Sequence, residues 1–173
     1  MAINTSVYGS LDEAQDYFDN RLHETAWSNA STDDHRKALI AARGVIDALN
    51  YKGDKATVYT LLQANEAATD EEIRAAEASQ PLEFPRGADT EVPEAVRIAE
   101  YEIAYALLDG KDPELELENL AVTSMGYGGV KTGYERTGLP IEHIINLVPS
   151  SVAWRLLKPF LRDSDAMRLL RLS

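Results

Sequence analysis

The residues that could carry phosphate or nucleophilic chemistry stand outside the patterns that such chemistry requires. A phosphate-binding loop places glycine directly before Lys-Ser/Thr, so that backbone amides wrap around the phosphate. Here Val130 precedes Lys131 and Thr132. A nucleophile elbow reads Gly-x-Ser-x-Gly, and residues 122–126 lack its first glycine. The two segments therefore predict neither nucleotide binding nor serine-based hydrolysis.

The candidate metal ligands are scattered along the chain. There is no cysteine, which excludes thiolate metal sites and cysteine nucleophiles. The histidines never stand four residues apart or in a His-Glu-x-x-His pattern; they are His23, His35 and His143. Acidic runs at 33–34 and 70–72 stand at expected helix starts, where the helix dipole favours negative charge. We therefore expect no enzyme activity, no cofactor and no bound metal ion.

The composition narrows the class of protein further. The 173 residues include 29 acidic and 17 basic side chains, which give a net charge of −12. A chain of this length usually forms one domain. No apolar run approaches the ~18 residues that cross a bilayer, so no membrane partner is expected. Nucleic-acid binding draws on clustered Lys and Arg, and the acidic excess argues against a general nucleic-acid binder.

The charge is unevenly distributed along the chain. Residues 149–173 contain five basic and two acidic side chains and so carry a net charge of +3, against −15 for residues 1–148. Such asymmetry reports association rather than fold. One interpretation is that the basic segment folds back on its own acidic body. The other is that copies of the chain pair head to tail, or that the segment docks on an acidic partner.

Helical periodicity predicts a helical body over residues 1–112. Ser10 and Glu13 form a capping box, and the apolar stripe that follows reaches Leu22. A second helix is expected from Ser31 or Thr32, with its stop at Gly53. A short surface helix over 69–79 and a long, regular helix over 93–110 complete the body.

The segment between the short and the long helix is expected to be extended. Pro81 and Pro85 each disfavour helix in the residue before them, so residues 80–87 should cross the body without regular structure. Phe84 is the expected anchor of this crossing. For Arg86 two interpretations stand: it helps to fix a structural crossover between the helices, or it makes an ion pair with another subunit.

Residues 113–148 are predicted to form a β-hairpin arm and a linker. The alternation of Leu and Glu after Pro113 marks a change of period, and residues 120–125 and 130–134 then suggest two strands around a glycine turn. A two-stranded hairpin is marginal in water. The arm is therefore expected to pack on the helices or to pair with a neighbouring chain.

Residues 149–173 are predicted to form a separable C-terminal docking helix with a basic tail. Ser150 caps the helix and Pro159 should end it. A docking face for a partner protein or for a second subunit is assigned to Trp154, Leu157, Phe160 and Leu161, with Arg155, Lys158 and Arg162 as its charged rim. The alternative is that these residues complete the core of the monomer. The fold class is thus mainly α: a small helical bundle with a β-hairpin arm and a separable C-terminal helix.

Three blocks of sequence resemble a known family when they are taken in order. Residues 8–27 contain Tyr-Gly-Ser and later Arg-Leu-His, residues 42–55 end in Tyr-Lys-Gly-Asp-Lys, and residues 80–86 read Gln-Pro-Leu-Glu-Phe-Pro-Arg. Together they are similar to the head–tail adaptor (connector, or head completion) proteins of tailed bacteriophages. Some of those proteins are labelled DnaT-like single-stranded-DNA-binding proteins. The resemblance covers residues 8–110 and, more loosely, 149–161.

The resemblance implies a structural protein of the virion neck, between capsid and tail. In that family, copies, commonly twelve, form a ring beneath the portal protein, extend the DNA channel and offer a surface to a tail, stopper or nozzle protein. Double-stranded DNA passes through the channel without specific binding, and an acidic lining would suit this passage. The alternatives are a single-stranded-DNA-binding replication accessory, which the second label suggests, and an acidic helical regulatory module.

Overall fold

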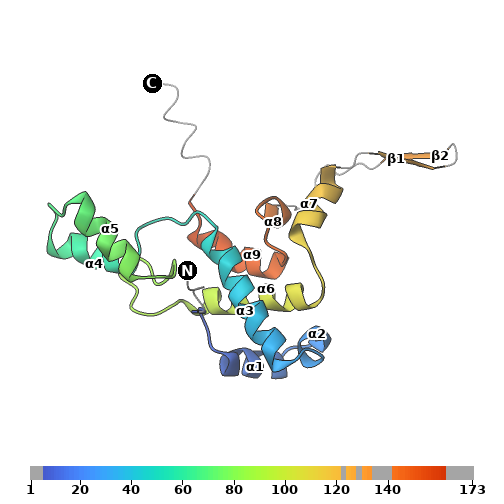
Figure 1. Ribbon diagram of the computed structural model, residues 1–173, viewed down its shortest axis with the longest axis horizontal. Coiled ribbons are helices and arrows are strands. Elements are labelled where there is room, and N and C mark those ends of the chain that lie inside the picture. Colours follow the sequence, from blue (N-terminus) through green and yellow to red (C-terminus); the bar gives the residue numbers. More distant parts are fainter. Residues whose placement is uncertain (1–5, 122–123, 128–129, 134–141, 163–173) are drawn as a thin grey trace.

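The computed structural model describes residues 6–121, 124–127, 130–133 and 142–162, which form a mainly helical protein (Figure 1). This confirms the predicted mainly α class. The helices are α1 (Leu11–Asp19), α2 (Thr25–Ser28), α3 (Thr32–Asp47), α4 (Ala56–Ala64), α5 (Asp70–Ser79), α6 (Glu94–Leu108), α7 (Pro113–Ala121), α8 (Glu142–Ile145) and α9 (Ser151–Leu157), which a 3-10 turn (Lys158–Phe160) extends.

The core lies where α6 packs against both α3 and α9, at the centre of Figure 1. Ile103 of α6, Ile46 of α3 and Leu157 of α9 are all fully buried there. At one end of this crossing α1 and α2 contact α6, and they bring Phe18 and Trp27 together as a stacked pair with ring centroids 4.4 Å apart. Burial of these apolar faces is the main stabilising term of the body.

Local capping signals set the helix starts where the sequence predicts them. Ser10 and Glu13 form a reciprocal capping box at α1, and Thr69 and Glu72 form another at α5. The hydroxyl of Ser31 accepts a hydrogen bond from the third residue of α3. In each case the hydroxyl satisfies an amide that has no partner within its own helix.

Two predicted helix ends differ from the structure. The first stripe was expected to include Leu22, but α1 ends at Asp19 and Leu22 is 82 % exposed. The chain turns there because His23 has a φ of +59°. The second helix ends at Asp47, well before Gly53, because Tyr51 turns inward and donates its hydroxyl hydrogen to the carbonyl of Ile46 at 2.9 Å.

The separable C-terminal helix is a wrong prediction, because α9 is part of the core. Leu157 is fully buried and Trp154 is 9 % exposed. Beyond the helix, the amide of Lys52 donates to the carbonyl of Phe160 at 3.0 Å, and the amide of Arg162 donates to Asn50 at 3.0 Å. Most of the apolar face assigned to docking is therefore buried in the core of the monomer, as the alternative interpretation proposed.

Two pairs of elements project from opposite sides of the body in Figure 1. On one side α4 and α5 pack against each other, and the hydroxyl of Thr57 donates to the carbonyl of Ala76 at 2.8 Å. Val58 is the only buried residue of these two helices. This agrees with the expectation that residues 69–79 elaborate the surface rather than build the core.

On the other side, α7 leads to β1 (Ser124–Tyr127) and β2 (Val130–Gly133), which pair antiparallel with Tyr127 opposite Val130. The expected first strand at 120–125 is wrong at its start, because α7 continues through Ala121. The cause is local: the Asp112 carboxylate accepts the amides of Glu114 and Leu115 at 3.0 and 3.2 Å. Pro113 then occupies the first helical position, which suits its fixed φ.

Truncation of Leu157 tests whether α9 belongs to the core. Leu157→Ala should lower the free energy of unfolding by about 2–5 kcal/mol, the usual cost of emptying a fully buried leucine site. Urea denaturation followed by circular dichroism measures this. Arg155→Ala, two residues away on the exposed side of α9, is the matched control and should change stability little. Equal stability of both variants would restore the docking-helix interpretation.

Candidate functional site

The crossing segment anchors an aromatic cluster that joins distant parts of the chain. Phe84 is 2 % exposed, and its ring packs edge-on against three others. The centroid distances are 6.0 Å to Tyr8, 4.7 Å to Tyr51 and 5.4 Å to Phe160. Each edge-to-face pair adds about 0.5–1.5 kcal/mol beyond the area it buries. We call Phe84 and the residues that hold its segment the crossover site.

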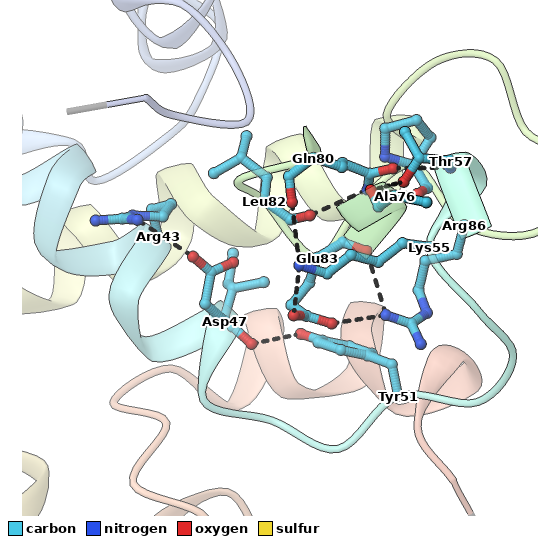
Figure 2. A network of polar contacts seen from close by, with 12 residues as sticks. Arg43, Asp47, Tyr51, Lys55, Thr57, Ala76, Gln80, Leu82, Glu83 and Arg86 are labelled. Carbon is cyan, nitrogen blue, oxygen red and sulfur yellow. Dashed lines mark hydrogen bonds and ion pairs between the residues drawn. The ribbon is translucent and has the colours of Figure 1, made fainter. Parts of the chain in front are cut away.

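Side chains, rather than regular secondary structure, provide hydrogen-bond partners for much of the backbone of this segment (Figure 2). The side-chain nitrogen of Gln80 (Nε2) donates to the backbone carbonyls of Leu82 and Pro85 at 3.0 and 2.9 Å. Its side-chain oxygen (Oε1) accepts from the backbone amide of Thr57 at 3.3 Å. The ammonium of Lys55 donates to the backbone carbonyl of Gln80 at 3.1 Å. Gln80 thus links the crossing segment to the start of α4.

Arg86 closes the other end of the crossover site from within the same chain. Its guanidinium donates to the carbonyls of Lys52, at 3.2 Å, and Gly53, and it meets the Glu83 carboxylate at 2.6 Å (Figure 2). Gly53 has a φ of +73°, a conformation that glycine adopts at little cost. These contacts favour the crossover interpretation of Arg86 over an ion pair with another subunit.

Tyr8, a residue of the first block that resembles the adaptor family, lies in the same site. The amide of Glu83 donates to the Tyr8 hydroxyl at 3.0 Å, and that hydroxyl donates to the Asp47 carboxylate. Arg43 lies 3.4 Å from the same carboxylate. Burial raises the pKa of Tyr8, and the hydrogen bond to Asp47 raises it further. Tyr8 therefore stays neutral and keeps its proton for Asp47.

Glu100 fixes the backbone next to Tyr8 from the middle of α6. Its carboxylate is fully buried, and its two oxygens accept the amides of Tyr8 and Gly9, each at 2.9 Å. Burial raises the pKa of Glu100 to about 7, although the two amides favour the charged form. Gly9 also lies against Tyr101, and a Cβ at position 9 would overlap that ring and its hydroxyl. Contacts with α6 thus explain Tyr8 and Gly9 of the Tyr-Gly-Ser block, and the cap of α1 explains Ser10.

Glu102, two residues along α6, ties down the end of α1. Its carboxylate meets the Arg21 guanidinium in a two-pronged contact at 2.8 and 3.0 Å and accepts the Tyr17 hydroxyl hydrogen at 2.6 Å. Arg21 also lies 4.3 Å from the centroid of the Tyr105 ring, a favourable cation–π distance. Sequence reasoning missed both glutamates. The available signal was two acids in the middle of a long and regular apolar helix.

The structure divides the residues that the sequence analysis assigned to interfaces. Phe84, Phe160 and Leu161 meet around Tyr51, where Leu161 and Tyr51 form an isolated antiparallel bridge. Arg86 and Arg162 line one polar pocket of about 290 Å³ beside them. The remaining members lie on α9 and at the start of the 3-10 turn that follows it. Trp154 and Lys158 both contact the carboxylate of Glu142, at 3.2 and 2.6 Å, and Arg155 is exposed.

The arrangement holds chain segments together; its polar groups bind one another. Both oxygens of Glu100 are occupied by amides, and Asp47, whose pKa burial raises, is engaged by Tyr8 and Arg43. Within the described residues there is no group of three or more metal-ligating side chains. Nor is any helix among them long and apolar enough to cross a membrane.

Comparison with protein-family models, with curated proteins and with solved structures found no match for this chain.

The buried carboxylate of Glu100 predicts a pH dependence of stability. Its pKa is raised from 4.5 to about 7, so the folded state binds the proton more tightly than the unfolded state. The resulting stabilisation is complete below pH 4.5 and is lost as the pH rises through 7. Glu100→Gln, a mimic of the protonated form, should gain about 3 kcal/mol relative to the wild type between pH 4.5 and 8.

Urea denaturation of both proteins across this pH range measures the relative change. Glu66→Gln, an exposed site, controls for the loss of one negative charge and should keep a constant difference from the wild type. If the difference in the free energy of unfolding between Glu100→Gln and the wild type also stays constant with pH, the carboxylate of Glu100 stays charged in the folded protein.

Removal of Arg86 should destabilise the isolated monomer. Arg86→Ala leaves three backbone carbonyls without this donor, those of Lys52, Gly53 and Glu83. The Glu83 carboxylate then keeps only Lys55, at 3.3 Å, and the loss should cost about 2–3 kcal/mol in the free energy of unfolding. Arg86→Lys should recover only part of the lost stability, because an ammonium cannot reproduce the several planar donors of the guanidinium. Arg74→Ala on the exposed face of α5 is the control. Wild-type stability in Arg86→Ala, combined with impaired self-association, would favour the intersubunit ion pair instead.

Proposed function

We propose that this chain is a structural head-to-tail adaptor of a tailed bacteriophage, which forms a ring beneath the portal and docks the next tail component. One observation carries the proposal: the three blocks that resemble adaptor proteins meet at the crossover site and its contacts with α6. Tyr8, Lys55 and Arg86 come from the three blocks and are bound to the same segment. These residues of the three blocks therefore follow a packing constraint, although Leu22 of the first block is exposed.

The projecting elements offer the contacts that a ring requires. Among the described residues, β1 and β2 pair only with each other, and a two-stranded sheet is marginal alone. Leu115 of α7, at the base of this projection, is 54 % exposed. We propose that the hairpin arm is completed by a neighbouring copy. Such head-to-tail contacts close into a ring when the rotation from one copy to the next divides a full turn evenly.

The tyrosines weigh against the alternative of single-stranded-DNA binding. Base stacking needs exposed aromatic rings beside basic residues. Tyr8, Tyr51 and Tyr101 are between 3 and 5 % exposed and serve the core. The net charge of −12 also repels phosphate, which suits a channel through which DNA slides without binding.

Electron microscopy of the chain mixed with the portal protein of the same virus tests the proposal. An added ring of density on the portal, with the symmetry of the portal, is the expected result. Replacement of residues 124–133 by a short Gly-Ser loop should abolish that ring while helicity and the thermal midpoint stay unchanged. Arg74→Ala, which alters an exposed side chain away from the arm, is the matched control and should still add the ring.

Two outcomes would overturn the adaptor function. One is a portal that gains no density from the wild-type chain. The other is salt-sensitive, submicromolar binding of the chain to single-stranded oligonucleotides in the absence of portal, which would favour the replication accessory.

A further inference from the structure

An apolar groove opens between the second half of α3 and the segment around α8. Its floor is made of small residues of α3, and its wall includes two of the large hydrophobic side chains that stand exposed: Ile145, at 58 %, and Leu147, at 39 %. The volume is about 580 Å³. A Cβ built on Gly44 meets no atom within 4 Å, so the floor is open to a close approach. Exposed apolar grooves of this kind mark interaction sites.

The described chain leads to the rim of this groove. The amide of Arg162 donates to the carbonyl of Asn50 at 3.0 Å, and Asn50 lines the groove together with Leu49. Residues 163–173 continue from that point. They would span about 16 Å as a helix, at 1.5 Å per residue, or about 36 Å fully extended. The segment therefore starts beside the groove and is long enough to cover it.

The composition of residues 163–173 complements the groove. After Asp165 there is no acidic side chain, and four large apolar residues alternate with two arginines. The apolar side chains match the uncovered Ile145 and Leu147, and the arginines match the exposed Glu114 on the rim. Opposite charges around an apolar contact fix its register. The segment following Arg162 has two aspartates at its start and two arginines in its second half, so it is neutral overall. Its match to the groove therefore lies mainly in its apolar side chains.

We propose that residues 163–173 dock in the groove between α3 and α8 of their own chain and cover Ile145 and Leu147. The contact is made by the monomer and does not depend on the adaptor function. It assigns the end of the C-terminal segment to its own chain rather than to another copy, one of the two interpretations that the sequence analysis left open. The same segment from a second copy is the rival occupant.

Cross-linking decides between the two occupants, because the natural chain has no cysteine. The variant Gly44→Cys with Leu170→Cys places one thiol on the groove floor and one in the segment. A short bis-maleimide should link them within one chain, at a yield independent of protein concentration, with the linked peptides identified by mass spectrometry. The control pairs Leu170→Cys with Ala75→Cys, on the exposed face of α5, and should link several-fold less.

Three results would overturn the proposal: links formed only between chains, which would assign the groove to a second copy; equal yields from the Gly44→Cys and Ala75→Cys pairs; or no link at all. A second measurement does not rely on cysteine. Deletion of residues 163–173 should increase the fluorescence of a hydrophobic dye several-fold, and an excess of the synthetic peptide 163–173 should reverse the increase. Unchanged dye fluorescence, in a truncated chain that circular dichroism shows to be folded, would contradict the docking.

Discussion

The burial of Phe84 in a segment without regular hydrogen bonding imposes the constraint on which much of this fold depends. A buried backbone needs a partner for each amide and carbonyl, and this segment has no helix or long ladder to supply them. The side chains of Gln80, Arg86 and Tyr8 supply them instead. Gln80 and Arg86 supply donors and Tyr8 supplies an acceptor. Each could be replaced only by a residue with a matching donor or acceptor of similar reach, which explains why these residue types stand where they do.

The same principle operates inside α6, which is surrounded by other helices and still carries two acidic residues. Glu100 accepts two backbone amides and Glu102 binds Arg21. A buried carboxylate is costly unless its hydrogen bonds are satisfied, and these are satisfied by the start of the described chain and by the end of α1. The two carboxylates thus convert a central apolar helix into an anchor for segments more than 80 residues away in sequence.

Local signals were readable from the sequence, and long-range ones were not. Ser10 with Glu13 predicts the start of α1 because the cap is completed within four residues. The pattern around Asp112 was misread because the Leu–Glu alternation outweighed a helix-start signal. An apolar face such as that of Leu157 looks the same whether it packs on its own core or on a partner. The role of Glu100 was hidden because its partners are backbone amides, which leave no trace in residue type.

The position of α9 restricts how this protein can assemble. Leu157 is fully buried, Trp154 is 9 % exposed, and Phe160 packs against Phe84. Leu157 and most of Trp154 therefore cannot contact a partner unless the core opens. Opening a core costs far more free energy than one interface residue returns. In the ring that we propose, contacts between copies are therefore expected from surfaces that stay exposed, above all the α4–α5 pair and α7 with its two strands. A body whose apolar faces are already buried can assemble through peripheral elements without refolding, and this is what the adaptor function that we propose would require.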